Sequence, residues 1–252
     1  MADPLLRVET ISKDFGGLRA VDRASFVAFP NRITALIGPN GAGKTTLFAI
    51  ISGFLRPSEG RVIYAGNDIT GLPPDRLARR GIARTFQIVQ PFAGLTVREN
   101  IAVGAHLSRP KRADALSAAG DVARSVGLTE YLDHPAANLT VAGRKRLELA
   151  RALAIEPRLL LLDEVLAGLN PSEIHDMVPV IRAITERGIT IVMIEHVMQA
   201  VMSLAEHVFV LSEGRIIAEG SPQAIARDPS VVDAYLGKGA AGRMTAAGGR
   251  HA

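Results

Sequence analysis

The sequence predicts an α/β fold with a mainly parallel sheet, and three features of the chain indicate it. Short apolar runs alternate with helical segments in the second half of the chain, which is typical of parallel strands buried on both faces. A glycine-rich loop lies between a buried strand and a helix near residue 40. Between residues 95 and 154, apolar residues recur three and four positions apart, which predicts helices.

The first half of the chain begins with two predicted strands, at 5–12 and 24–29, which start an antiparallel β subdomain. The turn between them contains Phe15, Gly16 and Gly17. The remaining predicted strands are 33–37, 61–65, 159–163, 189–194 and 207–211. The remaining predicted helices, outside the helical stretch of 95–154, are 73–80, 172–186 and 197–204.

Composition bounds the class of protein. The chain has 252 residues, of which 48% are hydrophobic and 21% charged, as expected for a soluble globular protein of one large or two small domains. It has no cysteine, which excludes disulfides and cysteine-ligated metals. The start lacks the features of a signal peptide, and the apolar runs are shorter than the roughly 20 residues of a membrane span. We interpret the net charge of +4 as a surface that favours solubility, and we expect residues 238–252, rich in Gly and Ala, to be disordered.

The glycine-rich loop reads GPNGAGKTT and matches the phosphate-binding pattern G-x-x-x-x-G-K-[ST]. In such a loop, successive backbone N–H groups and the start of the following helix bind phosphate oxygens. Lys44 would reach the β- and γ-phosphates, and the Thr45 hydroxyl would hold Mg²⁺. The residues that we expect to bind nucleotide are Gly38, Pro39, Asn40, Gly41, Ala42, Gly43, Lys44, Thr45 and Thr46.

Further polar residues follow other predicted strands. Asp163 ends an apolar strand, where it could bind Mg²⁺ through water, and Glu164 could polarise an attacking water. By itself, this acidic pair would equally well cap a strand. His196 follows another strand, at the end where open α/β sheets bind ligands, and Gln87 follows a short apolar run. A phosphate loop alone leaves kinases, GTPases, transport ATPases and motors open.

Taken in order, these segments resemble the ATP-binding subunit of an ABC transporter over residues 5–237. The resemblance implies that Glu164, His196 and Lys44 are catalytic and that Phe15 stacks on adenine. It implies that Gln87 contacts the nucleotide and, with Thr45 and Asp163, binds Mg²⁺. A signature motif that serves the site of a second subunit would contain Thr140, Val141, Ala142 and Gly143. A D-loop would contain Ala167, Gly168, Leu169 and Asn170.

The same resemblance implies a domain organisation and a set of partners. Residues 1–237 would form one nucleotide-binding domain, in which a helical subdomain of about 94–155 is inserted between Gln87 and the 159–163 strand. The partners would be a second ATP-binding subunit, identical or different, two integral-membrane permeases and, indirectly, a periplasmic or extracellular solute-binding protein, with no nucleic acid. The chain would lie peripherally on the cytoplasmic face of the inner (plasma) membrane and couple ATP hydrolysis to transport.

Several short segments are similar to one branch of this family, the importers of branched-chain amino acids. They are FGGLRAV at 15–21, TFQ at 85–87, LTVREN at 95–100, AGLNP at 167–171 and DAYLG at 233–237. Related branches import urea and short amides or drive lipopolysaccharide export, and these remain alternatives. A soluble ABC ATPase acting on ribosomes or DNA is a further alternative, although such proteins usually carry two cassettes or long insertions.

The signature segment departs from the usual LSGGQ form, since residues 139–143 read LTVAG. Thr140 keeps a hydroxyl that can cap a helix, whereas Ala142 adds a Cβ and Gly143 lacks a polar side chain. Val165 stands where a proline commonly follows the catalytic glutamate. We hypothesise that the composite site using this signature hydrolyses ATP slowly. A kinase is disfavoured by the histidine and the signature-like helix, and a pseudo-ATPase by the presence of all the charged site residues.

Overall fold

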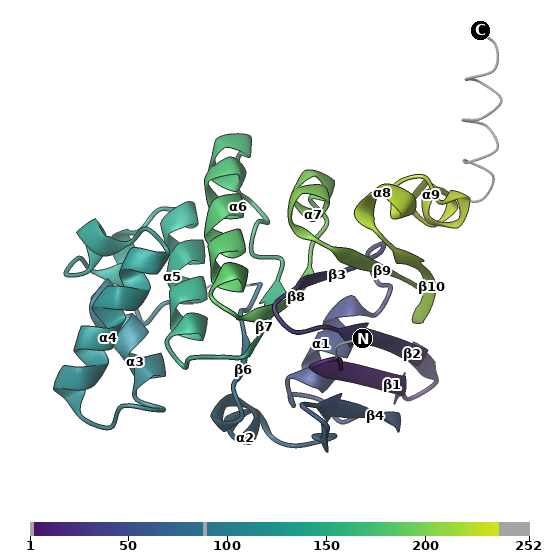
Figure 1. The fold of residues 1–252 in the computed structure, drawn as a ribbon, viewed down its shortest axis with the longest axis horizontal. Coiled ribbons are helices and arrows are strands. Elements are labelled where there is room, and N and C mark those ends of the chain that lie inside the picture. Colours follow the sequence, from purple (N-terminus) through teal and green to yellow (C-terminus); the bar gives the residue numbers. More distant parts are fainter. Residues whose placement is uncertain (1–2, 88–89, 237–252) are drawn as a thin grey trace, which may run out of the picture.

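The computed structural model describes residues 3–87 and 90–236, and its centre is a six-stranded sheet (Figure 1). The strand order is β10 (Arg215–Gly220), β9 (His207–Ser212), β3 (Ile33–Ile37), β8 (Thr190–Ile194), β7 (Leu159–Asp163) and β6 (Ile82–Arg84). Strands β9, β3, β8, β7 and β6 pair in parallel, while β10 pairs antiparallel with β9. The predicted α/β class with a mainly parallel sheet is confirmed.

A second sheet is antiparallel and lies beside the first (Figure 1). Its order is β2 (Leu18–Ala28), β1 (Leu6–Phe15), β4 (Glu59–Tyr64) and β5 (Asn67–Asp68). The β1–β2 hairpin turns at Gly16, whose φ of +58° lies in the left-handed region that favours glycine. Both predicted strands of this hairpin exist, but they run further towards the turn than the sequence indicated.

The helices fall into groups around the two sheets (Figure 1). Helices α3 (Val97–Ala105), α4 (Arg112–Ser125) and α5 (Val141–Leu153) lie together at one side, in the stretch that was predicted to be helical. Helix α1 (Lys44–Ile51) follows β3, and α2 (Pro74–Arg79) precedes β6. The helices after β7 are α6 (Pro171–Glu186), α7 (Met198–Leu204), α8 (Pro222–Ile225) and α9 (Pro229–Leu236).

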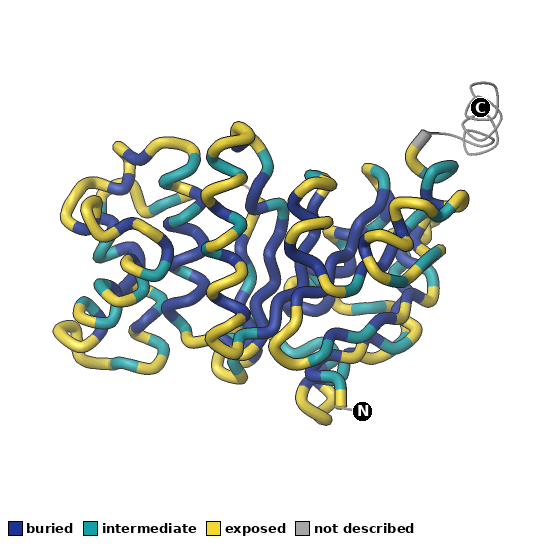
Figure 2. The backbone as a smooth tube through the Cα atoms, turned by 45° about the horizontal axis from the view of Figure 1, so that its top comes forward, coloured by how far each residue is buried: buried dark blue, intermediate teal, exposed yellow. Residues whose placement is uncertain are grey.

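The inner strands β3, β8 and β7 of the central sheet are buried on both faces, and the dark tube in Figure 2 runs through the middle of the molecule. Side chains alternate across a strand, so neighbouring leucines of β7 enter different cores. Leu160 and Leu162 pack in a core with residues of α3–α7, whereas Leu159 and Leu161 pack with α1 and the antiparallel sheet. This double burial is the reason why β7 and β8 read as continuous apolar runs.

The sequence analysis missed five elements of the described structure: β5, β6, β10, α8 and α9. Strand β6 has only three residues, the last of which is Arg84, so it is too short to show a periodic apolar pattern. Strand β10 alternates between intermediate and exposed residues, because it lies at the edge of the sheet. The predicted disordered tail at 238–252 lies outside the described residues. Within the described ranges, no helix is long and apolar enough to cross a membrane.

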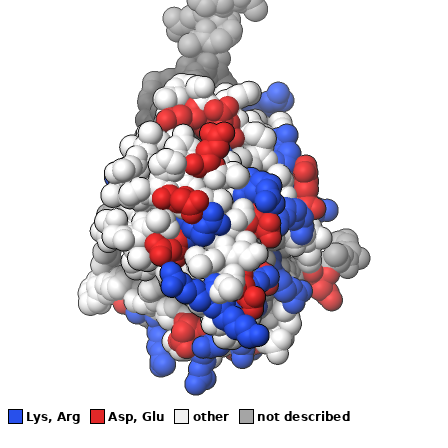
Figure 3. All heavy atoms as spheres, turned by 90° about the vertical axis from the view of Figure 1, so that its left-hand side faces the viewer, with Lys and Arg blue, Asp and Glu red and all other residues white. Residues whose placement is uncertain are grey.

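The surface on the side of α3 and α4 carries charges of both signs (Figure 3). In this region Arg124 pairs with Asp121 at 3.0 Å and Arg98 with Asp133 at 2.9 Å. Exposed pairs of this kind contribute little to stability. The mixture fits the interpretation of the mild net charge as a solubility feature.

Candidate nucleotide site

The carboxyl ends of four neighbouring parallel strands meet at one edge of the central sheet. Strand β3 leads into the glycine-rich loop, β8 into His196, β7 into Glu164 and β6 into Gln87. A cavity of about 590 Å³ opens there, and it is lined by Ala20, Asn40, Gly41, Ala42, Gly43, Lys44, Thr45, Thr46, Gln87, Glu164 and His196. The structure therefore brings together residues that are far apart in the sequence, at the edge where α/β sheets bind ligands.

The conformation of the loop explains two of its glycines. Gly38 has φ +151°, and a Cβ there would lie 1.9 Å from the carbonyl oxygen of Leu211. Gly43 has φ +103°, and its Cβ would lie 2.4 Å from the carbonyl oxygen of Ala20. No side chain caps the start of α1, and the first turn contains no acidic residue. The N–H groups and the positive dipole end of α1 therefore suit an anion.

Lys44 is buried within this loop. Its Nζ donates to the carbonyl oxygens of Gly38, at 2.7 Å, and Pro39, at 2.9 Å. Burial lowers the pKa of the ammonium, and the nearby carboxylates of Glu164 and Asp163 oppose that effect. The ammonium is thus held at the cavity by two loop carbonyls and two acidic neighbours.

Glu164 lies between two polar side chains at the wall of the cavity. Its Oε2 accepts a 2.6 Å hydrogen bond from Nε2 of Gln87, and its Oε1 lies 3.8 Å from Nδ1 of His196. The backbone of Glu164 has φ +49°, a left-handed conformation that costs a non-glycine residue about 1 kcal/mol or more. Strain of this kind persists where surrounding contacts fix the backbone, as they do here.

Asp163 lies deeper and is paired with an arginine that the sequence analysis did not single out. Nη2 of Arg84 is 2.7 Å from Oδ2 of Asp163, and both side chains are nearly buried. The other terminal nitrogen of Arg84 donates to Oγ of Ser52 at 2.9 Å. The sequence shows Arg84 after two apolar residues, three positions before Gln87. Its partner, Asp163, becomes visible only through the pairing of β6 with β7.

The donor set for a cation fits Mg²⁺. Thr45, Gln87 and Asp163 line one cavity of about 440 Å³. A hydroxyl, an amide oxygen and a carboxylate are the hard oxygen ligands that Mg²⁺ takes, usually with several waters. Over residues 3–87 and 90–236, no group of three or more His, Cys, Asp or Glu side chains could hold a metal.

The predicted signature residues begin α5, away from the cavity lining. Thr140 is the N-cap of α5, and its Oγ1 accepts a 3.1 Å hydrogen bond from the N–H of Gly143. Val141 is 56% exposed, so the start of this helix faces solvent. Ala142 lies in the first turn with ordinary helical backbone, where alanine is tolerated, so its added Cβ brings no backbone strain.

Phe15 and the predicted D-loop also lie outside the lining of the cavity. Phe15 is 48% exposed on the hairpin, with Nζ of Lys13 5.2 Å from its ring centroid. Gly168 is exposed with φ +79°, and Asn170 caps α6 through a hydrogen bond from the N–H of Glu173. Their roles toward nucleotide stay predictions.

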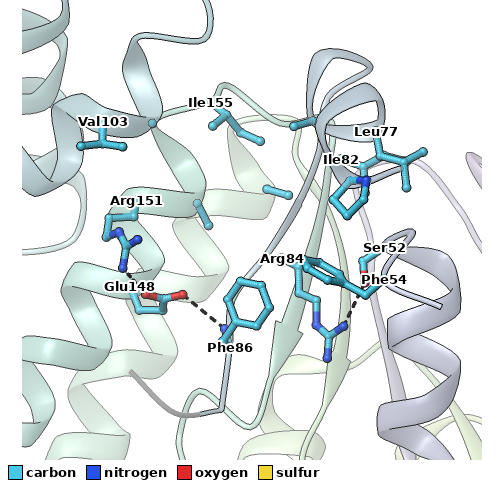
Figure 4. A pocket seen from close by; sticks show the side chains of 15 residues that line it. Ser52, Phe54, Leu77, Ile82, Arg84, Phe86, Val103, Glu148, Arg151 and Ile155 are labelled. Carbon is cyan, nitrogen blue, oxygen red and sulfur yellow. Dashed lines mark hydrogen bonds and ion pairs between the residues drawn. The ribbon is translucent and has the colours of Figure 1, made fainter. Parts of the chain in front are cut away.

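A largely apolar groove lies between α2, β6 and the α3–α5 group (Figure 4). Its volume is about 230 Å³. Phe54 and Phe86 meet edge to face in it at 5.5 Å between ring centroids, and Glu148 and Arg151 form an ion pair at 3.1 Å. The groove lies beside Gln87, because Phe86 precedes that residue directly.

Glu195, directly before His196, is a buried carboxyl that the sequence analysis missed. Its side chain is fully buried, its Oε1 accepts a 2.9 Å hydrogen bond from the N–H of Leu166, and its Oε2 has no partner. The pKa of Glu195 is raised to about 7, and burial is the main cause. The N–H of Leu166 opposes this rise, and the charge of Glu164 adds to it.

Glu195→Gln is expected to flatten the pH dependence of the unfolding free energy. A carboxyl whose pKa is raised on folding contributes stability that is complete below its ordinary value of 4.5 and lost as pH rises through about 7. A pKa difference of this size corresponds to about 3 kcal/mol of unfolding free energy. The unfolding free energy of Glu195→Gln should therefore exceed that of the wild type at pH 8 by up to that amount. Urea unfolding at pH 5 and pH 8 measures it, with the exposed Glu186→Gln as control. If the unfolding free energies of Glu195→Gln and the wild type changed equally between pH 5 and pH 8, the raised pKa of Glu195 would be contradicted.

The fold and the strand-end cavity define a nucleotide-binding P-loop ATPase. Comparison with known proteins supports this class. A family model described as "ABC transporter" matches residues 21–167, and one described as "Branched-chain amino acid ATP-binding cassette transporter" matches residues 215–241. The chain belongs to the ABC transporter family, as an ATP-hydrolysing cassette.

Named relatives and solved structures match almost the whole chain. The high-affinity branched-chain amino acid transport ATP-binding proteins LivG of Escherichia coli K12 and BraF of Pseudomonas aeruginosa are each 37% identical, over 94% of this chain and all of theirs. A probable LivG of Archaeoglobus fulgidus is 36% identical over 92% of this chain and 95% of its own. The crystal structure of a nucleotide-free ABC transporter cassette matches with a TM-score of 0.86 at 33% identity, over 94% of this chain and 100% of that one.

Proposed function

We propose that this chain is the ATP-binding and ATP-hydrolysing subunit of an importer of branched-chain amino acids. The observation that carries the proposal is the cavity that joins the phosphate loop with Gln87, Glu164 and His196. The substrate class is supported by the names of the relatives and by the match of residues 215–241 to the branched-chain amino acid cassette model.

The geometry supports a role for each group in the cavity. The loop N–H groups and the start of α1 bind the phosphates, and Lys44 neutralises charge on the β- and γ-phosphates. Glu164 accepts a proton from the attacking water. Gln87 orients the carboxylate of Glu164, and His196 orients the γ-phosphate. Thr45, Gln87 and Asp163 would hold Mg²⁺, which supplies charge stabilisation at the phosphates.

The site is completed by a second ATP-binding subunit arranged head to tail. The exposed start of α5 offers N–H groups and a positive dipole end, which suit the γ-phosphate bound by that subunit. Phe15 would stack on adenine, and residues 167–170 would lie at the contact between the subunits. ATP then favours the closed pair, and its hydrolysis removes the anion that holds the pair shut.

The apolar groove beside Gln87 suits a short helix from an integral-membrane permease subunit. One wall of the groove comes from α2 and β6, and the other comes from α3 and α5. We assign the α3–α5 group to a helical subdomain of about 94–155 within a single domain of 1–237. Movement between these walls would pass the closure of the ATP site to the permease. The chain would thus act peripherally at the cytoplasmic face of the membrane with two permeases and, indirectly, a solute-binding protein.

Copurification tests this assignment against a soluble, non-transport ABC ATPase. A tagged full-length chain, extracted with detergent from its native cells, should bring down two integral-membrane subunits. The Phe86→Asp variant introduces a charge into the groove and should lose them while still binding ATP. Recovery of ribosomal or DNA-bound partners instead would favour the alternative class.

Restoring the usual signature is expected to raise the ATPase rate. Changing residues 140–143 to Ser-Gly-Gly-Gln adds one polar contact to the partner's phosphate, and about 1 kcal/mol corresponds to about fivefold in rate. A Cβ at Gly143 would lie 3.2 Å from the side chain of Leu139, which must shift slightly. Phosphate release by the reconstituted transporter measures the effect, and Thr140→Ser alone, which keeps the cap, serves as control. An unchanged rate would show that this signature does not limit hydrolysis.

A further inference from the structure

A lysine of α5, the helix that begins with the signature residues, contacts two residues of the proposed mechanism, Glu164 and Gln87. Lys145 lies in the second turn of α5, and its side chain is buried. Its Nζ donates to the backbone carbonyl oxygen of Glu164 at 3.1 Å and to that of Gln87 at 3.3 Å. One ammonium on α5 therefore joins the segment after β7 to the segment after β6.

The same two residues also contact one another through their side chains, at 2.6 Å between Nε2 of Gln87 and Oε2 of Glu164. Their backbones and side chains thus form a closed arrangement with Lys145. One of the two carbonyls that Lys145 binds is that of Glu164, whose backbone is left-handed with φ +49°. A charged donor on this carbonyl stabilises the conformation that aims the Glu164 carboxylate into the cavity.

We propose that Lys145 is a positioning residue that holds Glu164 and Gln87 in place for hydrolysis and makes their geometry depend on the position of α5. This rests on the proposed function of the cavity and adds a control element to it. Because Thr140 caps the same helix and Gly143 lies in its first turn, a displacement of α5 would move the signature residues and would also move the Lys145 ammonium away from both carbonyls. Each subunit would then hydrolyse ATP only when its own signature helix is in place.

The charges around Lys145 support this role. Burial lowers the pKa of its ammonium, while Glu195, Glu164, Glu148 and Asp163 raise it, in decreasing order of effect. Four acidic groups, from α5, the end of β7 and the end of β8, thus favour the charged form of this buried side chain. An apolar side chain of similar length would fill the space but remove the donor from these two partly buried hydrogen bonds.

Lys145→Met in the full-length chain tests the proposal. We expect kcat for ATP hydrolysis to fall about 10- to 100-fold, since a small misplacement of a reacting group costs up to about that factor. KM for ATP should stay within about threefold, because Lys145 does not line the phosphate cavity. Lys111→Met, an exposed lysine before α4, is the matched control and should keep wild-type kcat.

A double-mutant cycle with Glu164→Gln separates positioning from general destabilisation. If Lys145 acts through Glu164, adding Lys145→Met to Glu164→Gln should lower the residual rate by less than about threefold. Additive losses, or a wild-type kcat in Lys145→Met, would overturn the inference. If Lys145→Met does not fold, Lys145→Gln, which keeps an uncharged donor group on a shorter side chain, should give an intermediate kcat, and a wild-type value there would equally overturn it. Absence of ATPase activity in the wild-type complex would instead overturn the proposed function.

Discussion

Glu164→Gln is expected to lower the steady-state ATPase rate by about 10²- to 10⁴-fold, the usual contribution of a general base. The amide has nearly the same shape but cannot accept the proton of the attacking water. Its neighbours support this role, since Gln87 and His196 contact the two carboxylate oxygens at 2.6 and 3.8 Å. ATP should still bind, and the variant should retain it unhydrolysed. Phosphate release and nucleotide retention on a filter measure the two properties.

The matched control is Glu186→Gln, an exposed glutamate at the end of α6. It should turn over ATP at the wild-type rate. Wild-type turnover by Glu164→Gln would show that another group activates the water. Loss of both binding and turnover would indicate that Glu164 maintains the cavity rather than the chemistry.

Lys44→Met is expected to lower turnover by about 10²- to 10³-fold, and in contrast to Glu164→Gln it should also weaken ATP binding. The ammonium is the buried cation of the phosphate loop, and without it the β- and γ-phosphates lose their charged partner. Titration with a fluorescent ATP analogue measures binding, and phosphate release measures turnover.

The unfolding free energy of Lys44→Met should change by only about 1 kcal/mol, because the loss of two bonds to loop carbonyls is offset by relief of a desolvated charge. Lys111→Met again controls for loss of a lysine. Unchanged ATP affinity in Lys44→Met would show that the loop holds phosphate without this side chain.

The sequence predicted the parallel sheet and the phosphate loop because their signals are local. Each buried strand is a continuous apolar run, and the pattern of the phosphate loop lies within consecutive residues. The contacts with Leu211 and Ala20 that exclude a Cβ at Gly38 and Gly43 are visible only in the structure. Strand β6 lacked such a signal, since its identity comes from pairing with β7, a strand more than 70 positions later.

The groups around the cavity could be predicted only in part. Asp163 and Glu164 were identified, but the partner of Asp163, Arg84, comes from a different strand. Lys145 and Glu195 were missed because charged residues are ordinarily exposed. Lys145 lies in a helix pattern and Glu195 precedes a strand-end histidine, and only the fold shows that both are buried. Phe15 remains a prediction, because its ring lies on the hairpin outside the cavity lining.

In the proposed function, ATP hydrolysis at this cavity energises the uptake of branched-chain amino acids. The most direct measurement is uptake of radiolabelled leucine, with urea in parallel, by proteoliposomes that contain the copurified complex, ATP on the side of this chain and the solute-binding protein on the other. We predict ATP-dependent leucine accumulation that disappears when this chain carries Glu164→Gln. Leucine accumulation unaffected by that substitution, or ATP-dependent accumulation of urea without leucine, would contradict the account.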